Sequence, residues 1–286
     1  MIKNIADIKT IAIIGSGTMG AGIAQVAASA GYSVILYDIN QESLPKAKAL
    51  IEKSLSLSVE KKRITEDQKN TYLSAIKITS SFNEVIADVI IEAIVEKLEA
   101  KQDLFSKLAA INNVSTIFAT NTSSIPISQI AERVSHPERV VGMHFFNPSH
   151  LMKLVEVIAG KETDIEVALT IRRLAEKIGK EVIMVKDSPG FIVNRVARQY
   201  YLESLKILEE GGADIQTIDS LLENIGFKMG AFKLMDLIGI DVNYSVTTSM
   251  YEAFNHEPRF RPNKIQEQKV LAGHLGKKTG QGFYKY

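Results

Sequence analysis

The sequence contains no cysteine among its 286 residues. This absence excludes a disulfide scaffold, a thiolate nucleophile, iron–sulfur clusters and cysteine-based zinc sites, and it is compatible with a reducing compartment. Zinc bound by histidine is also disfavoured, because His144 and His150 are six residues apart with Pro148 between them and so match no helical ligand pair. We therefore expect no metal site.

Three further absences exclude other classes of protein. Lys and Arg number 34 and Asp and Glu number 33, so the net charge is +1 and the basic surplus typical of nucleic-acid-binding proteins is missing. No run approaches the roughly 18 consecutive apolar residues of a membrane span. The N-terminus, which carries Asp7, has neither a long apolar segment nor a small-residue cleavage site. We expect a cytoplasmic protein that binds neither nucleic acid nor membrane.

The length corresponds to about two domains at roughly 150 residues each. Up to Lys186, short β-branched runs alternate with helical patterns, which predicts an α/β domain with a mostly parallel sheet and helices on both faces. Two helical patterns, at 41–60 and 65–74, form an insertion after the second strand. Two more, at 19–30 and 98–110, connect other strands. The predicted strands lie at 11–14, 33–37, 76–78, 89–91, 116–119, 139–142, 154–158 and 181–185.

Beyond Lys186 the pattern is helical. Apolar residues at helical spacing predict helices at 191–210, 214–223, 232–254 and 263–271, followed by an aromatic tail at 280–284. The predicted domains are therefore residues 1–186, an α/β domain, and residues 187–286, an all-α domain.

A glycine-rich loop follows the first predicted strand and opens a helix. Gly15, Gly17 and Gly20 fit the pattern G-x-G-x-x-G, and this context is the one in which the motif binds a dinucleotide. Gly15 permits the tight turn, Gly17 has no side chain to block a pyrophosphate, and Gly20 allows close packing of helix and strand. Thr18 and Met19 lie in the first helical turn, whose free N–H groups favour phosphate. These features predict a Rossmann-type domain.

Asp38 follows the second predicted strand, 18 residues after Gly20. That is close to the spacing of the acidic residue that binds a ribose 2′-hydroxyl, and a carboxylate there would repel a 2′-phosphate. We therefore expect NAD rather than NADP. The alternative is a glycine-rich turn with an N-capping aspartate.

Polar residues gather where other predicted strands end. One strand leads into the segment 120–124, another leads into His144, and Glu156 lies inside an apolar strand. Because function in open α/β sheets collects at the carboxyl ends of strands, we interpret His144 and Glu156 as a general-base pair, in which the carboxylate fixes the tautomer and stabilises the imidazolium. The alternatives are a half-buried structural histidine and a strand glutamate paired with Lys153.

Eight motifs occur in order along the chain: IIGSGTMGAG (13–22), IIEAIVEKLEAK (90–101), NTSS (121–124), HFFNP (144–148), MKLVEVI (152–158), DSPGFIVNRV (187–196), LMDLIGID (234–241) and GKKTGQGFY (276–284). With these motifs the sequence resembles the 3-hydroxyacyl-CoA dehydrogenase family, and most of all its short-chain bacterial 3-hydroxybutyryl-CoA dehydrogenases. The resemblance covers nearly the whole chain, and its specificity lies in the combination of motifs.

The resemblance implies a role for each matching site residue. His144 would be the catalytic base and Glu156 would orient it, while Ser123 and Asn194 would bind the substrate oxygen or maintain the catalytic geometry. The remaining cofactor-side residues would be Glu96, Lys101, Asn121 and Asn147, and Ser54 and Lys61 would contact the CoA tail.

The resemblance further implies an acyl-CoA substrate and a homodimer assembled through the C-terminal helical domain. His150 departs from the small or proline residues usual after HFFNP, and it either alters the acyl pocket or faces solvent. Two other dehydrogenase classes stay open: a sugar-acid dehydrogenase of the L-gulonate type, and a 2-hydroxy-acid or 6-phosphogluconate type. Asn194, in place of a catalytic lysine, counts against the second. A dinucleotide-binding sensor without turnover is the alternative outside enzymes.

Overall fold

The computed structural model describes residues 4–286. The chain forms two compact units, one ending at Ser188 and the other comprising Pro189–Tyr286. Within residues 4–286, no helix is long and apolar enough to cross a membrane.

The first unit is built on one eight-stranded sheet with the order β3-β2-β1-β4-β5-β6-β7-β8. All neighbouring strands are parallel except β6 and β7, which are antiparallel. The exception follows from the connection, because the segment between β6 and β7 is too short for the crossover that parallel strands need. The strands are β1 (Thr10–Ile14), β2 (Ser33–Tyr37), β3 (Ile76–Thr79), β4 (Val89–Glu92), β5 (Ile117–Thr120), β6 (Val140–Phe145), β7 (Leu154–Ala159) and β8 (Glu181–Lys186).

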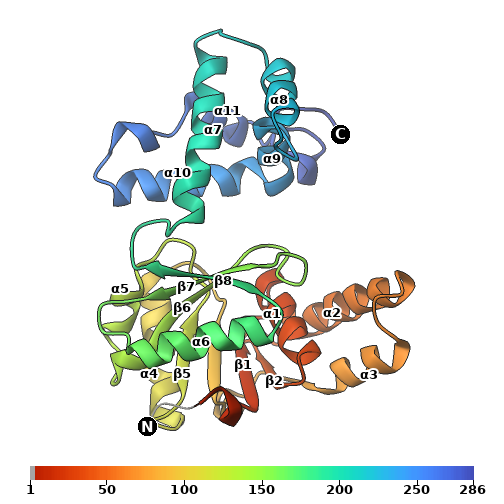
Figure 1. Ribbon diagram of the computed structural model, residues 1–286, viewed down its shortest axis with the longest axis vertical. Helices are drawn as coiled ribbons and strands as arrows, with labels where there is room; N and C mark the ends of the chain where they lie inside the picture. The colour runs from red at the N-terminus through yellow and green to blue at the C-terminus, as the bar shows by residue number, and fades with distance from the viewer. Residues whose placement is uncertain (1–3) are drawn as a thin grey trace. The chain divides into compact units, whose positions relative to one another are not determined.

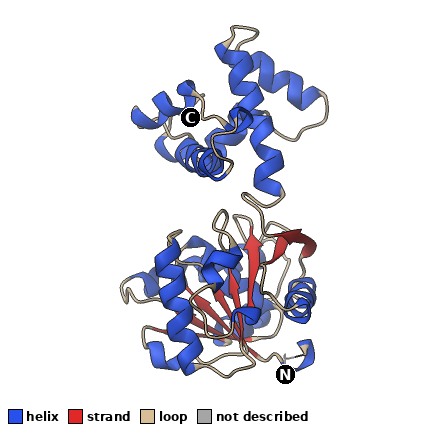
Figure 2. Ribbon diagram, turned by 90° about the vertical axis from the view of Figure 1, so that its left-hand side faces the viewer, coloured by secondary structure: helices blue, strands red, loops and turns tan. Residues whose placement is uncertain are grey.

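Helices cover both faces of this sheet (Figures 1 and 2). Helix α1 packs on β1 and β2, and α6 packs on β6, β7 and β8. The predicted mostly parallel sheet with helices on both faces is therefore confirmed. Neither α5 nor α6 is anticipated from the sequence, although Asp164 caps α6 by accepting a hydrogen bond from Glu166 N. The helices are α1 (Thr18–Ser29), α2 (Ser43–Glu60), α3 (Glu66–Ser74), α4 (Leu98–Ile111), α5 (Ile127–Ala131) and α6 (Ile165–Lys177).

The central strands of the sheet are buried on both faces. Every residue of β4, β5 and β6 is buried. Ile11 and Ile13 of β1 and Val89 and Ile91 of β4 form part of one core that also includes apolar side chains of α1 and α6. A parallel sheet covered on both sides requires such continuous apolar runs. The exceptions are polar residues near the carboxyl ends of strands, and these build the candidate site.

The second unit, Pro189–Tyr286, contains helices and no strand; only isolated bridges join Gly276, Gln281 and Lys285. The single helix predicted at 232–254 is wrong, because the chain breaks at Gly239, whose φ of 104° is a conformation that favours glycine. The all-α prediction itself is confirmed. The helices are α7 (Val193–Glu209), α8 (Ile215–Asn224), α9 (Ala231–Ile238), α10 (Ile240–Ala253) and α11 (Lys264–Leu271).

Two buried carboxylates attach the C-terminal tail to this helical unit. Asp219 accepts hydrogen bonds from Phe232 N, Lys233 N and the Tyr284 hydroxyl. Asp236 accepts hydrogen bonds from the backbone N–H groups of Phe283 and Tyr284. The aromatic tail predicted as a loop is thus held by side chains of α8 and α9.

Candidate active site

The glycine loop has the geometry that a bound pyrophosphate requires. Gly15 has a φ of 100°. A Cβ at Gly20 would collide with the Gly15 carbonyl, whereas a Cβ at Gly17 would have no atom within 4 Å. Gly17 is also the N-cap of α1, which begins at Thr18 and Met19. The loop therefore leaves open space beside free helix N–H groups, which fits a dinucleotide phosphate.

Asp38 lies just beyond β2 and is held by the glycine loop. Its Oδ2 accepts hydrogen bonds of 2.7 Å from both Ser16 N and Ser16 Oγ, and its Oδ1 accepts one from Asn40 N. Burial alone would raise the pKa of Asp38, but these hydrogen bonds outweigh burial and lower the pKa. A fixed, ionised carboxylate at this position suits a ribose hydroxyl. Ser16 was not predicted, although it lies within the glycine motif.

His144 and Glu156 lie directly opposite each other in the β6–β7 register. His144 Nδ1 and Glu156 Oε2 are 2.8 Å apart, and both side chains are buried. His144 belongs to β6 itself, since the strand continues to Phe145 rather than ending at 142 as predicted. Because the carboxylate can only accept, Nδ1 carries the proton of the neutral ring, and Nε2 then carries the lone pair.

The side chain of Glu96 organises the segment that follows β5. Its Oε1 accepts hydrogen bonds from Thr122 Oγ1 and Ser123 N, both at 2.7 Å, and from Ser124 N at 3.2 Å. Burial raises the pKa of Glu96, but the charge of Lys101 and these hydrogen bonds lower it further than burial raises it. The structure thus places Glu96 and Ser123 in contact. Thr122 was not predicted.

Lys101 is buried between two carboxylates rather than presented at the surface. Its Nζ lies 2.6 Å from Glu92 Oε1 and 3.1 Å from Glu96 Oε2. Glu92, at the end of β4, was not predicted as a site residue. The signal that identified Glu156, a carboxylate inside an apolar strand, could have identified Glu92 as well.

The remaining candidates are distributed over both units. Asn121 Oδ1 accepts a hydrogen bond from Phe145 N and so links the ends of β5 and β6. Asn147 is exposed and precedes Pro148 through a cis peptide bond. Asn194 belongs to the second unit, in the first turn of α7, and its part in the site stays a prediction. The cofactor and substrate roles of all these residues likewise stay predictions.

A cavity of about 230 Å³ lies against α1, α2 and the loop after β6. Ser54, predicted to contact the CoA tail, lines it, whereas Lys61 is exposed at the C-cap of α2. His150 also lines the cavity, and burial together with the charge of Lys180 lowers its pKa. Lys180 Nζ holds this loop by donating to the carbonyl oxygens of Ser149 and Met152. His150 therefore lines the cavity and is also exposed to solvent, so the two alternatives are not exclusive.

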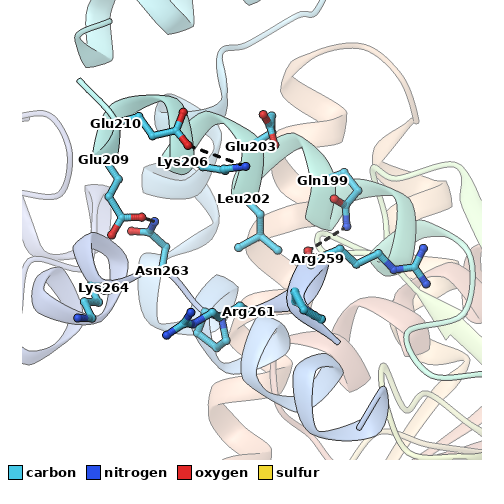
Figure 3. A pocket seen from close by; sticks show the side chains of 12 residues that line it. Gln199, Leu202, Glu203, Lys206, Glu209, Glu210, Arg259, Arg261, Asn263 and Lys264 are labelled. Atoms are coloured by element: carbon cyan, nitrogen blue, oxygen red, sulfur yellow. Dashed lines mark hydrogen bonds and ion pairs between the residues drawn. The ribbon is translucent and has the colours of Figure 1, made fainter. Parts of the chain in front are cut away.

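A second cavity, of about 670 Å³, lies within the helical unit (Figure 3). Helix α7 forms one side of it, and the segment 258–264 forms the other. Its charged lining residues carry both signs, and none of the predicted site residues lines it. The charged residues are Glu203, Lys206, Glu209, Glu210, Arg259, Arg261 and Lys264.

Among residues 4–286, no cluster of three or more His, Asp or Glu side chains could bind a metal ion. The first unit instead combines a glycine loop at a helix N-terminus, an acidic residue after the next strand, and a buried histidine–carboxylate pair in the same sheet. This combination defines the class of dinucleotide-linked dehydrogenases.

Comparison with known proteins specifies the family. Residues 10–188 match the profile of the "3-hydroxyacyl-CoA dehydrogenase, NAD binding domain", and residues 190–286 match that of the "3-hydroxyacyl-CoA dehydrogenase, C-terminal domain". The chain therefore belongs to the 3-hydroxyacyl-CoA dehydrogenase family, a family of NAD-dependent oxidoreductases, and its first unit is the family's NAD-binding domain.

Three relatives illustrate the similarity. The 3-hydroxyadipyl-CoA dehydrogenase of Escherichia coli is 46% identical over 98% of this chain, which spans only 59% of that protein. A probable 3-hydroxybutyryl-CoA dehydrogenase of Bacillus subtilis is 41% identical over 98% of both chains. The crystal structure of (S)-3-hydroxybutyryl-CoA dehydrogenase from Ralstonia eutropha superimposes with a TM-score of 0.93 at 37% identity, covering 98% of this chain and 99% of that one.

Proposed function

We propose that the protein catalyses the reversible NAD-dependent oxidation of (S)-3-hydroxyacyl-CoA to 3-oxoacyl-CoA, with 3-hydroxybutyryl-CoA as a substrate. The observation that carries the proposal is the buried His144–Glu156 pair in the sheet that also bears the glycine loop. The names of the relatives from Bacillus subtilis and Ralstonia eutropha support the short-chain substrate.

In the proposed reaction the substrate loses a hydride from C3 and a proton from its hydroxyl group, and the two go to different acceptors. NAD, when bound, supplies the carbon that accepts the hydride from C3 of the substrate. Nε2 of His144 takes the proton of the C3 hydroxyl, and Glu156 stabilises the resulting imidazolium through Nδ1. In the reverse direction the imidazolium returns the proton to the developing C3 alkoxide.

Neutral donors would hold the reacting oxygen in place. In this proposal the Ser123 hydroxyl and the Asn194 amide orient the C3 oxygen toward His144. Gly15, Gly17 and Gly20, with Thr18 and Met19, approach the pyrophosphate, and Asp38 accepts from the ribose. Glu96, Lys101, Asn121 and Asn147 complete the cofactor side, while Ser54 and Lys61 receive the CoA tail.

The proposal includes a homodimer formed through Pro189–Tyr286. Large apolar side chains on this unit are exposed, including Val196, Leu221, Ile225 and Phe227, and burying such residues is a usual driving force for association. Analytical ultracentrifugation would test this part independently of activity. A cytoplasmic location stays a prediction.

The decisive experiment follows NADH absorbance after addition of acetoacetyl-CoA, with NADPH and free acetoacetate in parallel reactions. We expect rapid loss of NADH with the thioester alone, and a fall of about 10²–10⁴-fold in kcat for His144→Gln with NADH binding retained. Activity with NADPH alone would contradict the role of Asp38. Turnover of a sugar acid but not of the thioester would favour the L-gulonate type, and tight NADH binding without turnover of any hydroxyacyl substrate would favour a sensor.

A further inference from the structure

Glu92 is a fully buried carboxylate at the carboxyl end of the otherwise apolar strand β4. Its oxygens accept three short hydrogen bonds: from Lys101 Nζ at 2.6 Å, from Thr120 Oγ1 at 2.6 Å and from Ile94 N at 2.7 Å. Burying a charge is costly unless it is paired and hydrogen-bonded. Glu92 meets both conditions, so its side chain has one well-defined position.

Lys101 extends this arrangement from the core toward the surface. Its side chain is 1% exposed, and its ammonium lies between Glu92, which is 0% exposed, and Glu96, whose side chain is 35% exposed. The three groups form a chain of charges, negative, positive and negative, that runs outward from the end of β4. The Lys101 ammonium thus has Glu92 on its buried side and Glu96 on its exposed side.

Glu96 passes this constraint to the segment after β5. The carboxylate oxygen opposite the one that faces Lys101 accepts from Thr122 Oγ1, Ser123 N and Ser124 N. A continuous series of contacts, through Lys101 and Glu96, thus links Glu92 to Ser123.

We propose that Glu92 is a positioning residue for the NAD-binding site, acting through Lys101 on Glu96 and the segment 122–124. The inference deepens the proposed function, because it rests on the assignment of Glu96 and Ser123 to the cofactor and substrate. Without the negative charge of Glu92, the buried ammonium of Lys101 keeps Glu96 as its one carboxylate partner among residues 4–286 and draws that side chain inward. Displacement of a site by even 1 Å is enough to weaken binding and catalysis strongly.

The test measures NADH affinity by isothermal titration calorimetry in Glu92→Gln, which keeps the shape of the side chain but removes its charge. We expect NADH to bind about tenfold more weakly. Asp88→Asn is the matched control: Asp88 lies at the opposite end of β4 and accepts hydrogen bonds from Lys9 N and Thr10 N. This variant should lose stability but keep NADH affinity within about twofold of the wild type.

A double-mutant cycle then separates positioning from general damage to the fold. In the Lys101→Met background we expect Glu92→Gln to change NADH affinity by less than about twofold, because its effect passes through Lys101. An equal loss in both backgrounds, an unchanged affinity in the single variant, or a comparable loss in Asp88→Asn would overturn the proposal.

Two further choices keep the result interpretable. If Glu92→Gln does not fold, Thr120→Val is the second variant, because it removes the hydrogen bond to Glu92 Oε2, the carboxylate oxygen that does not face Lys101. It should weaken NADH binding by about threefold. Unchanged affinity in this variant also overturns the proposal. Because NADH titration requires no acyl-CoA, an incorrect substrate assignment leaves the result unaffected.

Discussion

The two units satisfy their fully buried carboxylates in different ways. In the sheet unit, His144 is paired with Glu156, and Lys101 is paired with Glu92 and Glu96. In the helical unit, the buried carboxylates of Asp219 and Asp236 are satisfied by backbone N–H groups and tyrosine hydroxyls. Arg198, also buried there, donates to the Asn243 carbonyl and the Thr247 hydroxyl, and no carboxylate of the described part of the chain pairs with it.

The difference separates groups that can take part in chemistry from groups that hold the fold together. A buried carboxylate bound to backbone N–H groups at a helix start, as Asp219 is at α9, is fixed by permanent donors and by the helix dipole. A buried carboxylate bound to another titratable group can stabilise a change in the charge of that partner, as Glu156 can for His144. In this molecule Glu92 ends β4 and His144 lies near the end of β6, where α/β proteins place their sites, and Glu156 faces His144 from within β7.

The prediction with the largest expected effect on this comparison concerns catalysis by a Glu156 variant. Glu156→Gln should lower kcat by about 10²–10⁴-fold while the protein remains folded, because an amide can donate to Nδ1 and so favour the wrong tautomer of His144. Steady-state rates with acetoacetyl-CoA and NADH, together with thermal melting, provide the measurement. A rate within threefold of the wild type would place Glu156 with the structural carboxylates.

Asp219→Asn should show the opposite behaviour. Its carboxylate accepts from Phe232 N, Lys233 N and the Tyr284 hydroxyl, and the amide would leave at least one buried donor unsatisfied. We expect a loss of about 2–4 kcal/mol in the free energy of unfolding, measured by urea denaturation. NADH affinity, measured well below the melting temperature, should be unchanged; a loss of affinity without a loss of stability would contradict the comparison.

Most of the fold could be predicted from the local hydrophobic pattern of the sequence, and the errors of that prediction have physical causes. Buried strands carry continuous apolar runs, so β1, β2 and β4 are evident from the sequence, and the glycine loop identified the start of α1. The antiparallel direction of β7 is set by the short connection between β6 and β7 and not by the residues of the strand. The break between α9 and α10 lies within a continuous helical pattern, and the positive φ of Gly239 ends α9 there.

The candidate site residues that could be predicted are those whose role follows from a sequence motif and its spacing. Asp38 and the glycines follow from spacing, but Ser16 and Glu92 acquire their roles only when the ends of separate segments meet. The register that sets His144 opposite Glu156 likewise cannot be deduced from periodicity. The burial of Lys101 depends on α4 packing its charged side chain against the end of β4, a tertiary contact that the pattern of that helix does not reveal.

The smallest expected effect concerns alkaline pH and the C-terminal tail. Burial, the charge of Asp236 and a hydrogen bond to it raise the pKa of Tyr286 to about 12, and burial and Asp219 raise that of Tyr284. The ordinary tyrosine pKa is about 10. Because the folded-state pKa is higher, the contribution of these hydroxyls is fully present below about pH 10 and is lost as the pH rises toward 12.

Melting temperatures measured between pH 8 and 11.5 should therefore fall less steeply in Tyr284→Phe/Tyr286→Phe than in the wild type, although the double variant starts lower because two hydrogen bonds to buried carboxylates are gone. The comparison between variants cancels the titration of lysines that both proteins share. Parallel slopes would mean that the tail hydroxyls do not couple to Asp219 and Asp236. The helical unit would then hold its buried carboxylates by backbone donors alone, which sharpens the contrast with the paired charges of the sheet.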